Sequence, residues 1–313
     1  MTERRVVSKK RTPLVILRQD LTRNKHIYLI ILPVIVYYLV FHYLPMYGAL
    51  IAFKDFRPSR GIWGSPWAGF KHFQAFFGSY YFSRLIKNTL ALSVYSLIFG
   101  FPAPIILALL LNEVRANWYK RVIQTVTYIP HFISLVIICG IIVNFVKMDG
   151  VVSVIVKHIS GFDGNLLIDP RYFRSIYVVS GIWQHVGWSS IIYLATLAGI
   201  NYELYEAARI DGAGRWKQTW YITLPCLIPT ITILLILQIG SLMNVGFEKV
   251  MLLYNPGIYD TADVISTFVY RQGILAAQYS FSSAVGLFNS VINCTLVILA
   301  NKFSKKMTEN SLW

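Results

Sequence analysis

Six long stretches of the sequence contain no Asp, Glu, Lys or Arg, and no other feature restricts the possible folds as much. A helix needs about 20 apolar residues to cross the roughly 30 Å hydrocarbon core of a bilayer, and each stretch is at least that long. We therefore predict an all-α integral membrane protein with six transmembrane helices. The predicted spans are residues 27–53, 88–112, 122–146, 175–202, 226–247 and 272–301.

The composition agrees with this fold class and argues against others. Hydrophobic residues make up 56% of the chain and charged residues only 14%, whereas charged residues are roughly a quarter of an ordinary soluble protein. The net charge of +15 could indicate a nucleic-acid partner, but the basic residues are dispersed between the apolar stretches, so none is predicted. Cys139, Cys226 and Cys294 lie in separate apolar stretches, so neither a disulfide framework nor a metal site is predicted.

Alternate connecting segments differ in their content of Lys and Arg, and this difference predicts the orientation in the membrane. Residues 1–26, 113–121, 203–225 and 302–313 carry 17 of these residues, and residues 54–87, 147–174 and 248–271 carry 12. Because the richer side is retained in the cytoplasm, both termini are predicted to be cytoplasmic. The resulting organisation is a basic cytoplasmic tail (1–26), a first transmembrane helix too long for a cleaved signal peptide (27–53), an extracellular segment (54–87), a core transmembrane domain (88–301) and a cytoplasmic tail (302–313).

The cytoplasmic loop 203–225 combines features of a docking element. Its first part is rich in helix formers, and Glu206 and Arg209 lie three apart on one face of the predicted helix. Gly212 can adopt the left-handed conformation that ends a helix, and a second amphipathic turn precedes Pro225. The pattern predicts a rigid helix-turn-helix at the membrane surface, although a simple basic interfacial connector would share its composition.

The spacing within this loop is more specific than its composition. Glu206-Ala207-Ala208, three residues, Gly212, nine residues and then Ile222-x-Leu224-Pro225 resembles the EAA loop of binding-protein-dependent ABC importer permeases. The resemblance implies that the loop is the coupling helix, which fits into a cleft of a separate ATPase. The implied coupling residues are Glu206, Ala207, Ala208, Arg209, Asp211, Gly212, Leu224 and Pro225.

The sequence has no Gly-Lys dipeptide and hence no phosphate-binding loop of the G-x-x-x-x-G-K-[ST] type. We therefore expect no cofactor and no catalytic group on this chain, with ATP and Mg²⁺ bound by the partner ATPase.

Further stretches narrow the resemblance to one group of sugar permeases. Residues 206–213, 43–56, 254–266 and 284–290 resemble the LplB/YteP-type permeases of complex-sugar importers. This resemblance implies the type I ABC importer permease fold and a location in the bacterial cytoplasmic membrane. It also implies a second homologous permease, an ATPase dimer and an extracellular sugar-binding protein, often a lipoprotein.

Polar and aromatic side chains within the spans are candidates for contact with a sugar, because sugars bind through hydrogen bonds and through stacking on aromatic faces. The substrate-pathway candidates are Gln184, His185 and Trp188 in the fourth span and Gln238, Ser241 and Asn244 in the fifth. Asn289 and Asn293 are weaker candidates. All of these side chains could instead join helices through hydrogen bonds, and His131 could be a proton relay or a packing residue.

The predicted outer segments hold twelve basic and seven acidic residues. One hypothesis is an acidic substrate, such as a uronate-containing pectin or rhamnogalacturonan fragment; the alternative is that these charges contact lipid headgroups.

A secondary transporter or channel for small solutes is the alternative function. The predicted spans lack charge in mid-membrane, which argues against a proton- or sodium-coupled carrier and a voltage sensor. An integral-membrane enzyme has less support, because motifs such as HExxH and GxSxG are absent.

Overall fold

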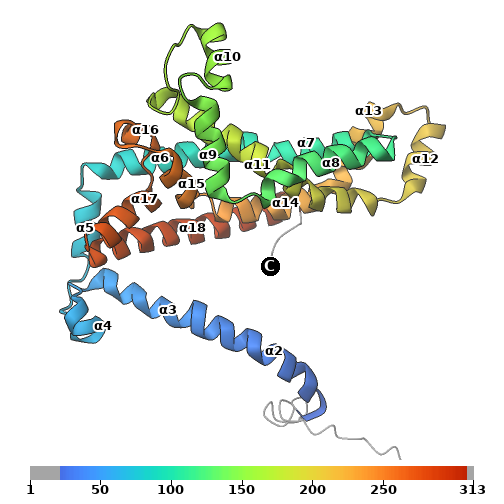
Figure 1. The fold of residues 1–313 in the computed structure, drawn as a ribbon. Helices are drawn as coiled ribbons and strands as arrows, with labels where there is room; N and C mark the ends of the chain where they lie inside the picture. The colour runs from blue at the N-terminus through green and yellow to red at the C-terminus, as the bar shows by residue number, and fades with distance from the viewer. Residues whose placement is uncertain (1–21, 309–313) are drawn as a thin grey trace, which may run out of the picture.

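The computed structural model describes residues 22–308 and shows a helical membrane protein (Figure 1). Within these residues the only β pairing is an isolated bridge between Lys54 and Trp67. Most of the predicted basic tail 1–26 and the last five residues of the predicted tail 302–313 lie outside the described residues. The predicted all-α class is therefore confirmed for the described part of the chain.

Four helices in the described residues are long and apolar enough to cross a membrane. They are Lys25–Phe53, Tyr81–Glu113, Arg215–Gly240 and Tyr279–Lys306. Their component helices are α2 (Lys25–Tyr38) with α3 (Leu44–Met46), α6 (Tyr81–Tyr95) with α7 (Pro102–Glu113), α13 (Arg215–Gln218) with α14 (Leu224–Gly240), and α18 (Tyr279–Thr308). Single π-helical turns join the paired segments, at Leu39–Tyr43, Ser96–Gly100 and Thr219–Thr223. A 3-10 helix at Tyr47–Phe53 ends the first candidate span, Lys25–Phe53, which is called the first rod below.

The predicted span 122–146 is not one straight helix. It divides into α8 (Asn117–Phe132) and α9 (Leu135–Val146), which meet at an angle of 105°. Ile133 and Ser134 have extended backbone torsions, directly after the helix that contains Pro130. The physical reason for the bend is that α9 buries its apolar side chains in a separate core, which it shares with the start of α11 and with residues 245–264.

The predicted span 175–202 corresponds to α11 (Pro170–Ala198), a helix of 29 residues. It is long enough to cross a membrane but does not match the four helices above in hydropathy. Helix length and composition thus give four spans, or five when the bent pair is counted as one. Asp169 caps α11 by accepting a hydrogen bond from the Arg171 amide at 2.9 Å, and the helix packs against α7, α8 and α14.

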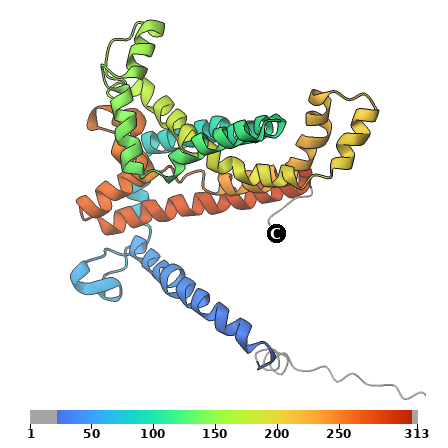
Figure 2. The ribbon, with the colours of Figure 1, turned by 45° about the vertical axis from the view of Figure 1, so that its right-hand side comes forward.

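The helices form an elongated bundle with different structures at its two ends (Figures 1 and 2). At one end α12 (Tyr202–Ile210) and α13 project from the bundle, and at the other lie α10 (Val151–Ser160) and α16 (Tyr259–Ala262). The first rod diverges from the bundle and packs on α18 through its end at Tyr47–Phe53. None of the 18-residue apolar window of this rod is buried within the chain, so the rod needs another apolar environment, as a membrane helix does.

The main apolar core lies at the α10 end. It joins side chains of α9, α11, α15 (Phe247–Leu253) and the segment that follows α15. Fully buried examples are Ile138, Phe173 and Val250. The shorter helices at this end are α4 (Gly61–Gly64), α5 (Lys71–Phe77) and α17 (Ile265–Tyr270), with 3-10 turns at Pro58–Arg60 and Pro256–Ile258 and a π-helical turn at Arg271–Leu275.

A buried ion pair fixes α17 to its surroundings. Asp263 is fully buried, and Arg271 binds it in a bidentate manner, with nitrogen–oxygen distances of 2.8 and 2.6 Å. Thr267 donates a further hydrogen bond to this carboxylate at 2.8 Å, and Arg84 lies 3.7 Å from it. Because a buried charge must be paired to be tolerated, this cluster constrains the relative positions of α6 and α17.

The ion pair gives a first prediction. Asp263→Asn keeps the shape of the side chain but leaves the Arg271 guanidinium without its carboxylate, and we expect a loss of about 3–5 kcal/mol in unfolding free energy. Asp260→Asn is the matched control, because the Asp260 side chain is 83% exposed, and a change within about 0.5 kcal/mol is expected there. Unfolding of the detergent-purified variants measures both, and equal stabilities would contradict the role given to Asp263.

The close contact between α8 and α11 gives a second prediction. A Cβ atom at Gly187 would overlap the backbone carbonyl of Thr127, whereas a Cβ atom at Gly140 would meet nothing within 4 Å. We expect Gly187→Ala to destabilise the protein by about 1–3 kcal/mol through overpacking, and Gly140→Ala to be neutral or stabilising by up to about 1 kcal/mol. The two midpoints of thermal unfolding, compared with that of the wild type, test this order; the reverse order would show that the two helices can separate at no cost.

Candidate functional site

The loop between α11 and α14 begins with a well-capped helix. The Asn201 side chain accepts a hydrogen bond from the Glu203 amide at 3.0 Å at the start of α12. At its end Gly212 has a φ of +74°, the left-handed conformation predicted for it. The Gly212 amide donates to the Arg209 carbonyl at 3.0 Å and the Ala213 amide to the Ala208 carbonyl at 2.8 Å. This pair of hydrogen bonds is a Schellman motif, which ends the helix at a defined angle.

The second half of the loop is bonded back onto the first. The Gln218 side chain donates to the Ala213 carbonyl at 2.7 Å, and the Tyr205 and Thr223 hydroxyls are 2.9 Å apart. These contacts join α12 to the turn that leads into α14. The loop is therefore a rigid extension of α14.

The outer surface of this loop is exposed and partly apolar. Ile210 is 87% exposed, Trp216 77% and Tyr221 80%. The Arg209 guanidinium binds the Tyr202 hydroxyl at 3.0 Å, and Glu206 has no ion pair within the described residues. Of the predicted coupling residues, Glu206, Ala207, Arg209, Asp211, Gly212 and Pro225 are exposed, and Ala208 and Leu224 are partly buried.

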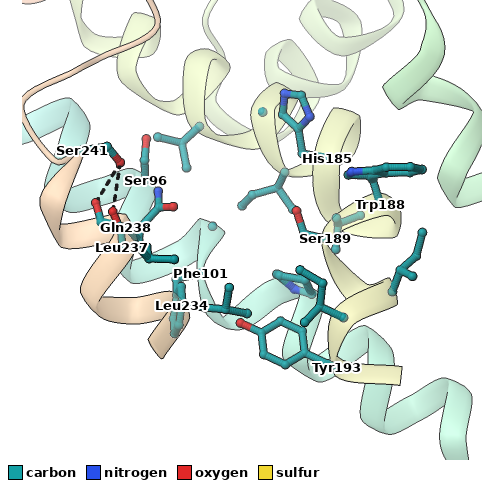
Figure 3. Close-up of a pocket in the computed structure, with 18 of the residues that line it drawn as sticks. Ser96, Phe101, His185, Trp188, Ser189, Tyr193, Leu234, Leu237, Gln238 and Ser241 are labelled. Carbon is teal, nitrogen blue, oxygen red and sulfur yellow. Dashed lines mark hydrogen bonds between the residues drawn. The ribbon is translucent and has the colours of Figure 1, made fainter. Parts of the chain in front are cut away.

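A cavity of about 850 Å³ lies between α11, α14, α15 and the α6–α7 segment. Four of the predicted pathway residues line it. Figure 3 shows His185 and Trp188 on α11, across the cavity from Gln238 on α14 and from Ser241, which directly follows that helix. The sequence predicts the first two residues in the fourth span and the other two in the fifth, and the fold brings all four to one cavity.

His131 of α8 packs against two of these residues. Its ring stacks on Trp188 with a centroid distance of 4.6 Å and an interplanar angle of 2°. The Nδ1 atoms of His131 and His185 are 3.2 Å apart, so the N–H group of one ring donates a hydrogen bond to the unprotonated nitrogen of the other. His131 therefore holds the aromatic wall of the cavity in place.

Gln184 and Asn244 are not among the residues that line the cavity. Gln184 is buried, with its side-chain oxygen unbonded within the described residues. The Asn244 side-chain oxygen accepts hydrogen bonds from Asn289 and Asn293, each at 3.1 Å. The structure thus places Asn244, in the irregular segment after α14, in contact with the two weaker candidates on α18.

The chain is irregular between the end of α14 and the start of α15, and side chains of other helices satisfy its backbone. Ser93 of α6 donates to the Leu242 carbonyl, and Asn293 of α18 accepts from the Met243 amide at 3.0 Å. The Tyr177 hydroxyl of α11 accepts from the Gly246 amide at 3.1 Å. Irregular backbone at membrane depth is tolerated where protein covers it or where it lines a cavity, and this segment adjoins the cavity.

Sequence reasoning missed Lys249, which the structure places in the wall of the cavity. Its side chain is buried, and its ammonium donates to the Tyr177 carbonyl at 3.0 Å and lies 4.9 Å from the centre of the Tyr177 ring. Burial lowers the pKa of this group from 10.5 to about 8. The predicted span 226–247 excluded Lys249, because the spans were defined by the absence of charged residues. The sequence signal that could have identified Lys249 is its position within the largely apolar segment 247–253.

A helical membrane bundle with a rigid loop at one end, and with a cavity between its helices that is lined mainly by apolar and by a few polar side chains, is the architecture expected of a transport permease. A family model for the binding-protein-dependent transport system inner membrane component matches residues 100–309. The chain belongs to this family. It is therefore a membrane component of a transport system and has the ABC importer permease fold.

Named relatives resemble almost the whole chain. Protein LplB of Bacillus subtilis (strain 168) is 47% identical over 94% of this chain and 92% of its own length. The polygalacturonan/rhamnogalacturonan transport system permease protein YteP of the same organism is 44% identical, with the same coverage. The predicted resemblance to sugar permeases of this type is confirmed.

Solved structures show the same fold. A chain of a bacterial ABC transporter involved in the import of the acidic polysaccharide alginate is 45% identical, covers 93% of this chain and 99% of its own, and has a TM-score of 0.85. A chain of a bacterial alginate ABC transporter in complex with an alginate pentasaccharide-bound periplasmic protein is 44% identical, with coverages of 94% and 99% and a TM-score of 0.86.

The buried ammonium gives a third prediction, on pH. The unfolded chain holds the Lys249 proton up to about pH 10.5 and the folded chain only up to about pH 8, so between these values stability rises with pH. Below pH 8 the buried charge costs about 3 kcal/mol by this shift. We therefore expect Lys249→Met to be more stable than the wild type at pH 7, and the difference to shrink between pH 8 and pH 10.5.

Thermal unfolding in detergent between pH 7 and pH 10.5 measures the difference in stability between Lys249→Met and the wild type. Lys87→Met is the control, because Lys87 is exposed and its loss should give no such pH-dependent difference. A wild type that is the more stable at pH 7, or a difference that does not change with pH, would contradict the prediction.

Proposed function

We propose that this chain forms, together with a second homologous permease, the translocation pathway of an ATP-driven importer for acidic oligosaccharides. An ATPase dimer, which binds ATP and Mg²⁺, docks on the loop of α12 and α13. An extracellular sugar-binding protein delivers the substrate to the opposite end. The chain spans the bacterial cytoplasmic membrane six times, with α11 and the bent pair α8–α9 as two of the spans and with both termini in the cytoplasm.

The observation that carries the proposal is the construction of the loop. It is capped at Asn201, turned at Gly212 and bonded back at Tyr205, so it can transmit force without deforming. It also exposes Ile210, Trp216 and Glu206, which has no ion pair among residues 22–308, and this is the mixture of apolar and charged groups expected at a protein interface. The loop projects from the bundle, where a partner can reach it (Figure 2).

The position of α18 supports the proposed topology. Its final turns, which carry Lys305 and Lys306, run toward the same end of the bundle as α12 and α13 (Figure 2). Lys and Arg are retained on the cytoplasmic side of membrane proteins. The end that holds the loop is therefore assigned to the cytoplasm.

Two observations support an acidic oligosaccharide as substrate. The cavity is of the size that holds organic ligands, about 300–1,000 Å³, and it presents an indole, an imidazole and an amide, groups that suit sugar rings and hydroxyls. In addition, YteP is named for polygalacturonan and rhamnogalacturonan, and the similar solved transporter imports alginate. All three are polymers that carry uronates, and rhamnogalacturonan fragments are the cargo that we favour.

Glu206→Lys tests the coupling. The complete importer is reconstituted in proteoliposomes with ATP supplied to the ATPase side, and uptake of a labelled oligogalacturonate is followed. We expect uptake to fall at least about tenfold and the ATPase to dissociate during purification, because a charge reversal at an interface costs several kcal/mol.

The matched control is Asp149→Lys, an equal charge reversal at an 81% exposed residue of the opposite end, which should leave both readouts near the wild-type level. Uptake that needs no ATP and is insensitive to Glu206→Lys would overturn the proposal in favour of a secondary transporter or channel.

A further inference from the structure

Lys249 differs from every other residue of the cavity wall. Among the residues that line the cavity it is the only Lys or Arg, and none of them is Asp or Glu. It also has no ion pair in the part of the chain that the structure describes. This contrasts with Asp263 and Arg271 at the same end of the molecule, where the buried charges are paired at 2.6 Å.

The surroundings of the ammonium leave it partly unsatisfied. An ammonium has three N–H donors, and one of them is used by the Tyr177 carbonyl. The Tyr177 ring, Cys139 and His185 are the other groups that interact with it, and none of them carries a full negative charge to balance it. A buried cation of this kind is costly unless an anion or further hydrogen-bond acceptors approach it.

The cavity reaches Lys249 beside a glycine. Gly181 lines the same cavity, and a Cβ atom placed on it would lie 3.4 Å from the Lys249 Nζ atom. A larger side chain at position 181 would therefore occupy the approach to the ammonium. Ligand atoms that enter the cavity can reach Nζ over this glycine.

We propose that Lys249 is a substrate-binding residue, which pairs with a carboxylate of the acidic oligosaccharide as it passes through the cavity. The proposal rests on the function proposed above. It assigns the importer's preference for acidic sugars to the Lys249 ammonium. Gln238 and Ser241 lie on the other wall of the same cavity and are available to sugar hydroxyls, and Trp188 offers an aromatic face to a ring (Figure 3). A single carboxylate contact also lets the substrate leave, since the ammonium keeps its bond to the Tyr177 carbonyl.

The test compares two substrates and three variants in the reconstituted importer. The substrates are labelled trigalacturonate and the same trisaccharide with its carboxyl groups reduced to alcohols. The variants are Lys249→Met, which keeps the apolar stem, Lys249→Arg, which keeps the charge, and Lys87→Met, an exposed lysine outside the cavity. Stimulation of ATP hydrolysis by the substrate-loaded binding protein shows that each complex is folded and assembled.

We expect Lys249→Met to lower the transport efficiency for trigalacturonate by about tenfold to a hundredfold, the range of a hydrogen bond to a charged group. Transport of the reduced trisaccharide should change less than about threefold. Lys249→Arg should restore most of the trigalacturonate transport, and Lys87→Met should leave transport of both substrates unchanged.

The outcomes separate the two claims. If the wild-type complex transports neither trisaccharide, or only the reduced one, the proposed function fails. If the wild type transports trigalacturonate and Lys249→Met does so equally well, the role of Lys249 is overturned. An equal loss of both substrates in Lys249→Met, with ATP hydrolysis still stimulated, would also overturn it, because the residue would then serve the structure and not the carboxylate.

Discussion

Every backbone N–H and C=O group inside a bilayer must find a partner within the protein, and the rest of this structure depends on that constraint. Most of the described chain meets it with helices. The segment 241–246 meets it differently, through the side chains of Ser93, Asn293 and Tyr177, which bind three of its backbone groups. Because the helix stops there, the chain can turn and present the first turn of α15 to the cavity.

Tyr177 connects this irregular segment with the charge in the cavity. Its hydroxyl accepts from the Gly246 amide at 3.1 Å, and its carbonyl accepts from the Lys249 ammonium at 3.0 Å. One residue of α11 therefore fixes both the end of the irregular segment and the position of the buried cation. The polar wall of the cavity is thus built around a residue that is itself part of a long, continuous helix.

The loop of α12 and α13 and the cavity share two helices. α11 leads into the loop and carries His185, and α14 leaves the loop and carries Gln238. The hydroxyls of Thr196 and Thr230 join the two helices close to the loop, 3.1 Å apart. On the proposed function, a displacement of the loop by the ATPase would move both walls of the cavity together, as expected for rigid elements that act as levers.

Hydropathy and turn chemistry predicted much of this architecture, because both depend on local sequence. Each apolar stretch is largely helical, and Gly212 adopts the conformation that its position required. Pro130 predicts a kink in this span, but the angle of 105° could not be predicted, because it depends on where α9 buries its side chains.

Lys249 was missed for a related reason: a charge is tolerated near a span only when the tertiary structure supplies partners, which the sequence does not display. The same limit applies to Asn244, whose hydrogen bonds to α18 depend on the packing of two distant segments.

The central claim is that the loop of α12 and α13 docks on an ATPase, and site-directed cross-linking tests it most directly. In a cysteine-free version of the chain, Ile210→Cys places a thiol at an 87% exposed position of the loop, and Tyr80→Cys places one at an 86% exposed position of the opposite end. We expect a short bifunctional reagent to join Ile210→Cys, and not Tyr80→Cys, to the ATPase subunit of the purified importer. Cross-linking from Tyr80→Cys alone, or from neither position in a complex that hydrolyses ATP, would contradict it.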